Sequence, residues 1–169
     1  MTYLDEAAVE LVAGYPKFED GRVDYSRAKV SYCLNCVAVA GDEVLLTVRS
    51  ERVNIYPGAV SGVSGYVDRP DLAVEEQARI ELDEEVGAPE AKITAGEMMV
   101  QVDERLGREW RIFPVLAEFD EKFVPKLNWE NQAAEWYKIE EAREMELMPG
   151  FAEILEEALK LRREVKNER

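Results

Sequence analysis

Residues 65–88 constrain the fold of this chain more than any other stretch, because a glycine-rich loop leads there into a helix that carries an acidic cluster. Asp71, directly after Pro70, is the expected N-cap of a helix that begins near Leu72. Gly87 is the expected stop, since the residue after a last helical turn often needs a positive φ angle. Apolar residues recur at every fourth position between these signals and predict one buried stripe, formed by Val74, Ala78, Leu82 and Val86.

Three carboxylates share one face of the same helix. Glu81, Glu84 and Glu85 stand at i, i+3 and i+4, and Glu81 and Glu85 project beside the apolar stripe rather than opposite it. Like charges at this spacing repel by a few tenths of a kcal/mol when exposed, and by more when partly buried. A hard divalent cation with oxygen ligands would offset that repulsion. A solvated acidic face is the alternative, and the spacing alone does not separate the two.

The composition predicts a water-soluble globular protein. The 169 residues, 47% of them hydrophobic, suit one domain over 1–169, with 1–29 as an N-terminal lead-in. A formal net charge of −15 repels polyanions, so non-specific binding of nucleic acid is not expected. No apolar run approaches the roughly 18 residues of a membrane span, and the N-terminus has no signal-peptide pattern. We therefore expect no membrane partner and a cytoplasmic location.

The chain contains no histidine and two cysteines, which narrows its chemistry. Catalytic triads, general bases and metal ligands that depend on histidine are ruled out. Cys33-Leu34-Asn35-Cys36 has no second pair to complete a zinc site. A redox pair would open a helix, whereas this segment has the pattern of a strand, in which positions i and i+3 face opposite ways. We expect two buried, inert thiols rather than redox chemistry.

The rest of the chain alternates strand patterns with a few helices. Strands are expected at 30–40, 44–48, 91–102 and 110–119, and helices at 5–13 and 150–166 in addition to the acidic one. Gly107 marks the turn between the last two strands, and Pro114 suggests an edge or a bulge. The charged residues 162–169 are expected to fray. This order predicts an α/β fold with a mixed β-sheet between helices, and the 91–119 hairpin leaves a homodimer open.

The acidic helix resembles the Nudix box, the signature of the Nudix hydrolases. That box reads Gly, five residues, Glu, seven residues, then Arg-Glu-aliphatic-any-Glu-Glu-any-Gly-aliphatic. The matching positions are Gly65, Glu81, Leu82, Glu84, Glu85 and Gly87. Ile80 replaces the box Arg, Leu72 replaces the first Glu, and the loop after Gly65 is one residue longer. Residues 125–139 resemble the late loop of archaeal-type members, and the whole resemblance spans about 30–160. It implies a Nudix-like α/β/α sandwich.

The resemblance also assigns site residues. Glu81, Glu84, Glu85 and the Gly65 carbonyl would bind Mg²⁺, with Mn²⁺ as a substitute. Glu84, Glu85 or Glu130 would act as general base, with Glu135 as a second choice outside the box. Arg49 and Arg52 would hold a diphosphate, since an arginine fork donates two hydrogen bonds to phosphate. Arg79, next to the missing box Arg, would brace the helix.

The implied activity is Mg²⁺-dependent hydrolysis of a nucleoside diphosphate linked to another group (NDP-X), a small nucleotide-type substrate whose X the sequence leaves open. A Nudix-like domain that binds a nucleotide without turnover is the main alternative, favoured by Ile80 and Leu72. A diphosphate isomerase of the isopentenyl type would need histidine ligands that the chain lacks. A purely structural acidic domain would bind no divalent ion.

Overall fold

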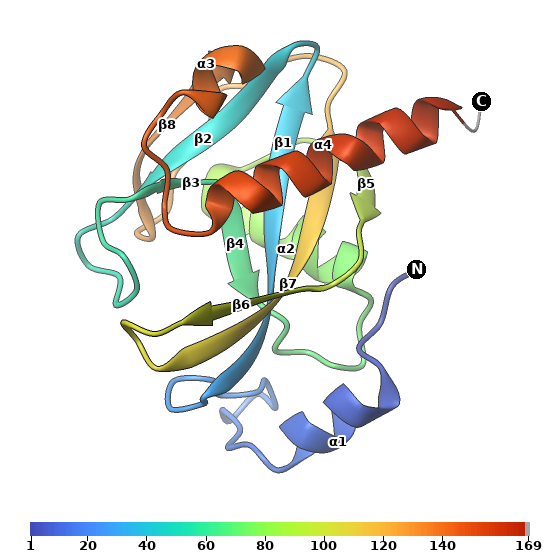
Figure 1. Ribbon diagram of the computed structural model, residues 1–169, viewed down its shortest axis with the longest axis vertical. Coiled ribbons are helices and arrows are strands. Elements are labelled where there is room, and N and C mark those ends of the chain that lie inside the picture. Colours follow the sequence, from blue (N-terminus) through green and yellow to red (C-terminus); the bar gives the residue numbers. More distant parts are fainter. Residues whose placement is uncertain (168–169) are drawn as a thin grey trace.

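A mixed sheet lies at the centre of the molecule, with helices on both of its faces (Figure 1). The computed structural model describes residues 1–167, with side chains up to residue 162. The helices are α1 (Glu6–Ala13), α2 (Val74–Val86), α3 (Ile139–Arg143) and α4 (Phe151–Asn167). The strands are β1 (Val30–Ala40), β2 (Glu43–Arg49), β3 (Val60–Ser61), β4 (Val63–Tyr66), β5 (Lys92–Ala95), β6 (Met99–Asp103), β7 (Arg108–Glu118) and β8 (Asn131–Lys138). The predicted fold class is confirmed.

Strand β1 organises the sheet. It runs parallel to β7 over ten residue pairs, from Val30 opposite Glu109 to Val39 opposite Glu118. Its other edge is shared by β4 and β2, both antiparallel, and β2 continues the sheet to β3 and β8. Most of β1 is buried because helices cover both faces.

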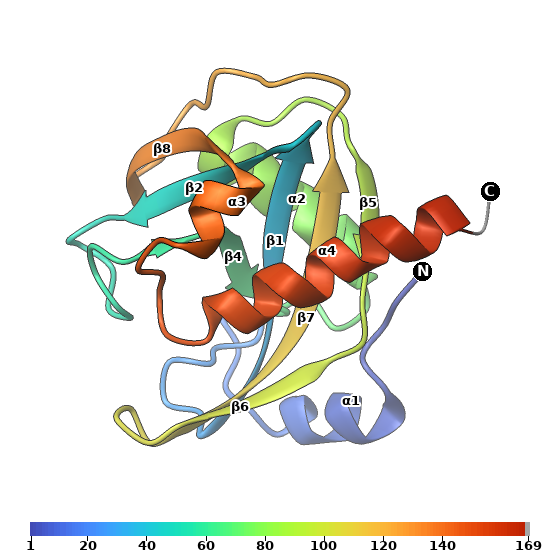
Figure 2. The same ribbon diagram turned by 45° about the horizontal axis from the view of Figure 1, so that its top comes forward.

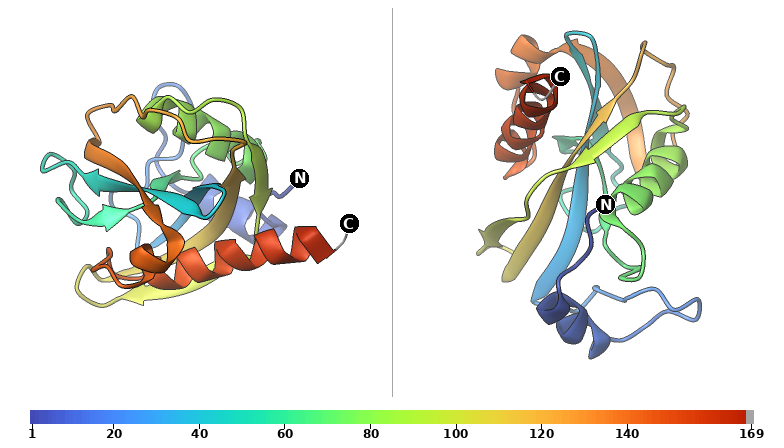
Figure 3. Two further views of the ribbon diagram at one scale, coloured as in Figure 1. Left: turned by 90° about the horizontal axis from the view of Figure 1, so that it is seen from above. Right: turned by 90° about the vertical axis from the view of Figure 1, so that its right-hand side faces the viewer.

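The two helix layers are best separated from the side. Figure 3 shows α2 on one face of the sheet and α4 on the other. Figure 2 shows α4 running across β1 and β7. The predicted stripe of α2 is buried, and α4 also buries an apolar stripe, formed by Phe151, Ile154, Leu155, Ala158 and Leu159. In the part of the chain that the structure describes, no helix is long and apolar enough to cross a lipid bilayer.

The two cysteines face opposite sides of β1, as expected. Cys36 lies in the core beneath α2, and Cys33 packs against the core beneath α4. Burial raises the pKa of the Cys33 thiol to about 12 and that of Cys36 well above its ordinary value. Both thiols are free and stay protonated at neutral pH, so they are poor nucleophiles.

The start of α2 differs from its prediction. The helix begins at Val74 with Ala73 as N-cap, and Asp71 is exposed rather than capping. Residues before it form a turn, in which the Leu72 amide donates to the Arg69 carbonyl. Glu76 satisfies the Ala73 amide instead, at 3.2 Å. The end is as predicted, because Gly87 caps the helix with φ 61°.

The strands after α2 also differ from their prediction. Residues 91–102 form two strands, β5 and β6, which both pair with β7. The break lies opposite Pro114, whose carbonyl accepts a bond from the Gly96 amide at 2.7 Å. Pro114 is therefore in the sheet interior, and its missing N–H faces the gap between β5 and β6. The Gly107 turn is confirmed, with φ 63°. Fraying is expected for residues 162–169; α4 continues to Asn167, and residues 168 and 169 lie outside the described residues.

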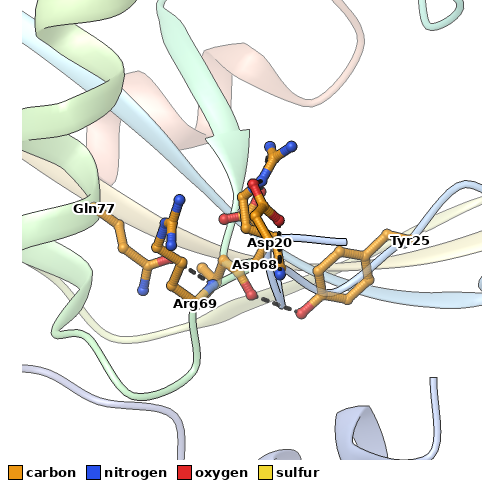
Figure 4. A network of polar contacts seen from close by, with 7 residues as sticks. Asp20, Tyr25, Asp68, Arg69 and Gln77 are labelled. Carbon is orange, nitrogen blue, oxygen red and sulfur yellow. Dashed lines mark hydrogen bonds and ion pairs between the residues drawn. The ribbon is translucent and has the colours of Figure 1, made fainter. Parts of the chain in front are cut away.

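The N-terminal lead-in supports the loop that enters α2. Asp5 caps α1 by accepting from the Ala8 amide at 2.8 Å. The hydroxyl of Tyr25 (Figure 4) donates to the Val67 carbonyl at 2.8 Å. The Val23 amide donates to the Asp68 carbonyl at 2.8 Å. The lead-in therefore holds the segment between β4 and α2.

Candidate metal and phosphate site

The last turns of α2 place the three box carboxylates in three different environments. Glu85 is buried, Glu81 is half-buried and Glu84 is exposed. The first two flank the apolar stripe, as their spacing predicts, and Glu84 lies at the rim. The backbone therefore pushes two carboxylates of one helix face into the protein, where their charge is costly.

Glu85 is the most constrained of the three. Its Oε1 accepts a hydrogen bond from Asn131 Nδ2 at 3.0 Å. Its Oε2 is buried and has no hydrogen-bond partner among the residues that the structure describes. Burial, followed by the neighbouring Glu130, raises its pKa well above the ordinary value, and Asn131 opposes that rise. A buried oxygen of this kind, aimed at no donor, has room in its coordination for a cation.

Glu81 lies against the backbone of Gly65. A Cβ atom at Gly65 would meet the Glu81 carboxyl group at 2.4 Å, so a larger residue would displace that carboxylate. Burial, then Glu130 and Glu84, raises the pKa of Glu81 to about 8. The glycine at this position is therefore explained by the close approach of an acidic side chain.

Glu130 joins the cluster from far along the sequence because its loop docks on the end of α2. The Lys126 amide donates to the Val86 carbonyl at 2.9 Å, and the Asn128 amide donates to the Glu85 carbonyl at 3.4 Å. Asn128 Nδ2 donates to Glu130 Oε1 at 3.3 Å. Burial raises the pKa of Glu130, while Asn128 and Arg49 act to lower it. The loop thus brings a third, oriented carboxylate beside the helix.

Arg49 provides positive charge at this cluster. It ends β2 where the pairing with β8 is irregular, since Val48 pairs with Ala133 and Arg49 with Asn131. Such irregularities re-aim side chains. Arg49 is half-buried, and its Nε donates to the Ile55 carbonyl at 2.8 Å. Burial lowers its pKa, and Glu85 and Glu130 oppose that effect. A half-buried arginine at this position is suited to hold an anionic group such as a phosphate.

Arg52 and Arg79 lie outside the cluster. Arg52 is exposed, with its guanidinium 5.9 Å from the centre of the Trp129 ring. Arg79 is also exposed, donates to the Ala91 carbonyl at 3.5 Å, and reaches no carboxylate among the described residues. Gln77 braces the loop before α2 instead. Its Oε1 accepts from the Arg69 amide at 3.2 Å (Figure 4), and its Nε2 donates to the Leu72 carbonyl at 3.1 Å.

A cleft of about 920 Å³ begins beside the cluster. Arg49, Gly65 and Glu130 line one end, with Arg52 and Trp129. The cleft continues past Trp110 and Ile112 to β6 and to the start of α4. Its volume lies at the upper end of the range of small-molecule sites. The cleft therefore has room for a ligand whose charged part meets the cluster and whose apolar part extends along the sheet.

The donor set suits a hard divalent cation. As the side chains stand, no group of three or more Cys, Asp or Glu residues in the described chain is arranged as a ready metal site. Three observations nevertheless fit a cation. Among the described residues, Glu85 Oε2 has no hydrogen-bond partner, and Gly65 leaves space for the Glu81 carboxylate. Burial, followed by the neighbouring Glu130, raises the pKa values of both Glu81 and Glu85. All donors are oxygens, which Mg²⁺ and Mn²⁺ prefer.

Sequence reasoning found most of these residues but missed their supports. The structure brings together Gly65, Glu81, Glu85, Glu130 and Arg49, leaves Glu84 and Arg52 at the rim, and places Arg79 elsewhere. Glu135 is exposed on β8, where its Oε2 accepts from the Tyr137 hydroxyl at 3.0 Å. Asn131 and Gln77, both buried, were not singled out. The sequence signal for each of these two residues is a polar side chain at a position that faces the core.

Solved structures share this fold at low sequence identity. The NUDIX domain of Shewanella oneidensis NrtR, solved with ADP ribose, gives a TM-score of 0.67 at 17% identity, over 93% of this chain and 98% of that one. The MutT protein of Methanosarcina mazei Go1 gives 0.60 at 20%, over 85% and 99%. A Caenorhabditis elegans Ap4A hydrolase gives 0.58 at 20%, over 75% and 93%. No curated protein matches the chain. At these identities, the likeness establishes the fold.

These structures come from an archaeon, a bacterium and an animal, so the narrower likeness to archaeal-type members is not supported.

Family membership follows from the sequence itself. The family described as the NUDIX domain matches residues 33–158, a span that runs from β1 through the α2 carboxylates and Glu130 into α4. The resemblance of the acidic helix to the Nudix box is therefore confirmed, and the chain belongs to the NUDIX domain family.

Proposed function

We propose that this protein is a hydrolase that uses a divalent metal ion to cleave the diphosphate linkage of an NDP-X compound. Its family supports a pyrophosphohydrolase. One observation carries the finer proposal: Glu81, Glu85 and Glu130 form a partly buried acidic cluster with raised pKa values, next to Arg49 and the cleft. A bound cation would neutralise the carboxylates, and a bound diphosphate would neutralise Arg49.

The metal would be held by Glu81, Glu85 and the carbonyl of Gly65, with Glu84 reaching in from the rim. Mg²⁺ or Mn²⁺ bound there would supply Lewis acidity toward the phosphate oxygens. Asn131 keeps Glu85 oriented by its bond to Oε1. Gly65 gives the Glu81 carboxylate its place beside the strand. These supports hold the ligands before any substrate arrives, which limits the reorganisation needed for reaction.

The remaining residues would act on the substrate and the water. Arg49 binds the diphosphate from the side opposite the carboxylates, and Arg52 adds charge at the rim. Glu130 takes the proton of the attacking water, because Asn128 orients its carboxyl group and Arg49 favours its ionised form. Water oxygen bonds to one phosphorus, the bond from that phosphorus to the bridging oxygen breaks, and two phosphate-ended products leave.

The test is hydrolysis of a panel of NDP-X compounds with and without Mg²⁺ or Mn²⁺. The double variant Glu84→Gln/Glu85→Gln should lose metal-dependent activity and remain folded. Asp83→Asn, an exposed acid on the same helix, is the matched control and should keep full activity. Full activity in the double variant would refute the assignment of these carboxylates.

A binding module without turnover is the second candidate. Ile80, at the position of the box Arg, is 40% exposed, and Arg79 does not replace that arginine's ion pair among the described residues. Saturable binding of a nucleotide at high Mg²⁺ with no product formed from any compound in the panel would favour this candidate.

A further inference from the structure

The two walls of the cleft are joined by one polar contact. Tyr56, in the loop between β2 and β3, and Asp103, at the end of β6, both line the cleft. The Tyr56 hydroxyl donates to Asp103 Oδ2 at 2.7 Å. In Figure 1 this loop reaches toward the turn between β6 and β7. We call this contact the Tyr56–Asp103 clasp.

Both partners of the clasp are held in place. Asp103 Oδ1 accepts from the Leu106 amide at 3.1 Å, which anchors the carboxylate to the β6–β7 turn. The guanidinium of Arg105 lies 5.9 Å from the centre of the Tyr56 ring. Asp103 thus uses one oxygen for its own turn and the other for the loop across the cleft.

The loop bends unfavourably to make the clasp. Tyr56 has φ 46°, and among the described residues it is the one position other than glycine with a positive φ. This region costs an ordinary L-residue about 1–2 kcal/mol. A bulky aromatic residue has no local reason to adopt it, so the contact with the opposite wall is the compensation that the structure offers.

The same loop is tied to the candidate phosphate site. Arg49 Nε donates to the carbonyl of Ile55, the residue before Tyr56. The loop is therefore fixed at Arg49 on the side of the acidic cluster and at Asp103 on the side of β6. A ligand that runs from the cluster along the cleft must fit within the width that these two attachments set.

We infer that the Tyr56–Asp103 clasp is a specificity-determining element that limits the length of group X. This inference rests on the proposed function, because it concerns the group that the same cleft would accept. A diphosphate at Arg49 with a short X fits beneath the clasp. A longer X must break the hydrogen bond between Tyr56 and Asp103, and the loss of this bond weakens the binding of the longer substrate. Loss of the clasp therefore favours long substrates over short ones.

The test compares two substrates that differ by one base. ADP-ribose and the dinucleotide diadenosine diphosphate share an adenosine and a diphosphate, and the second carries an additional adenine on X. The quantity measured is the kcat/KM of the dinucleotide divided by that of ADP-ribose, which a general loss of folding or activity does not change. Tyr56→Phe should raise this ratio about fivefold or more, the effect of one hydrogen bond of ordinary net strength.

Two further variants make the outcome decisive. Tyr137→Phe removes a matched bond between a tyrosine hydroxyl and a carboxylate, on β8 away from the cleft, and should leave the ratio unchanged. Asp103→Ala breaks the clasp from the other wall and should raise the ratio like Tyr56→Phe. An unchanged ratio in Tyr56→Phe, or a rise in that variant alone, overturns the inference.

Failure of the proposed function has a different signature. If the wild-type protein cleaves no compound of the NDP-X panel, the hydrolase proposal fails. Where it cleaves neither of these two compounds, the clasp is tested by the ratio of their dissociation constants from calorimetry, with the same criterion. If neither compound binds, the inference about the clasp fails.

Discussion

Replacing Glu85 by glutamine should stabilise the metal-free protein while removing its response to metal. Glutamine has nearly the same shape and keeps an acceptor oxygen for Asn131 Nδ2, so the bond to Asn131 survives. The change removes a carboxylate whose Oε2 is buried without a partner and whose neighbours Glu81 and Glu130 repel its charge.

The size of the gain follows from the cost of that buried oxygen. An unsatisfied buried polar group costs about 1–3 kcal/mol, and more when it is charged. Protonation of Glu85 recovers part of this cost in the wild type, so we expect a gain of about 1–2 kcal/mol at pH 7. For a chain of this length, that corresponds to a rise of roughly 2–8 °C in Tm.

Thermal unfolding with and without metal provides the assay. In metal-free buffer, Glu85→Gln should melt above the wild type. Saturating Mg²⁺ should raise the Tm of the wild type, because a ligand that binds only the folded state stabilises it, and should leave the variant unmoved. The Asp83→Asn control should follow the wild type in both buffers. A variant that melts lower without metal, or that responds fully to Mg²⁺, would refute the account of Glu85 as an uncompensated ligand.

Further predictions concern neighbouring residues. Gly65→Ala should leave Tm nearly unchanged but weaken Mg²⁺ binding in calorimetry, because its Cβ displaces the flexible Glu81 carboxylate rather than the backbone. Undiminished binding would contradict the role of Gly65 in leaving space for the Glu81 carboxylate. Gln77→Ala should lower the free energy of unfolding by about 1–3 kcal/mol in urea, since it leaves the Arg69 amide and the Leu72 carbonyl without their partner; a loss within error would show that the loop needs no such brace. Metal-free stability should fall as pH rises from about 4.5 to about 8, because Glu81 binds its proton more tightly in the folded state (pKa about 8) than in the unfolded state (4.5); Glu81→Gln should flatten this dependence in urea unfolding curves, and an equally steep curve would contradict it.

Much of the fold could be predicted because local signals and packing agree. The four-residue repeat of α2 and the glycine after it leave little choice of buried face or end point. The segment of strand β1 is rich in Val, Tyr and Ala, which predicts a strand, and the opposite orientation of Cys33 and Cys36 follows from the two-residue period of a strand.

Other features depend on contacts that no short stretch encodes. Asp71 has the side chain of an N-cap, but the turn from Arg69 to Leu72 delays the helix to Val74. The division of 91–102 into β5 and β6 depends on Pro114, a residue of the partner strand. Local propensity cannot report either effect.

In the candidate site, too, some features follow from local sequence and others depend on tertiary contacts. The carboxylates of α2 follow from spacing and family pattern, since one helix carries them all. The place of Asn131 beside Glu85 depends on the docking of residues 126–130 on the helix end, which is a tertiary contact between segments 46 residues apart. The exposed position of Arg79 likewise reflects which face of α2 meets the sheet.

Calorimetric titration of the protein with Mn²⁺ at neutral pH tests most directly whether the acidic cluster is a metal site. We expect saturable binding to the wild type and to Asp83→Asn, accompanied by release of protons, because a pKa of about 8 leaves Glu81 largely protonated at neutral pH before the metal displaces its proton. Binding should be lost in Glu81→Gln/Glu85→Gln. An absence of binding to the wild type, or equal binding to the double variant, would contradict the central claim.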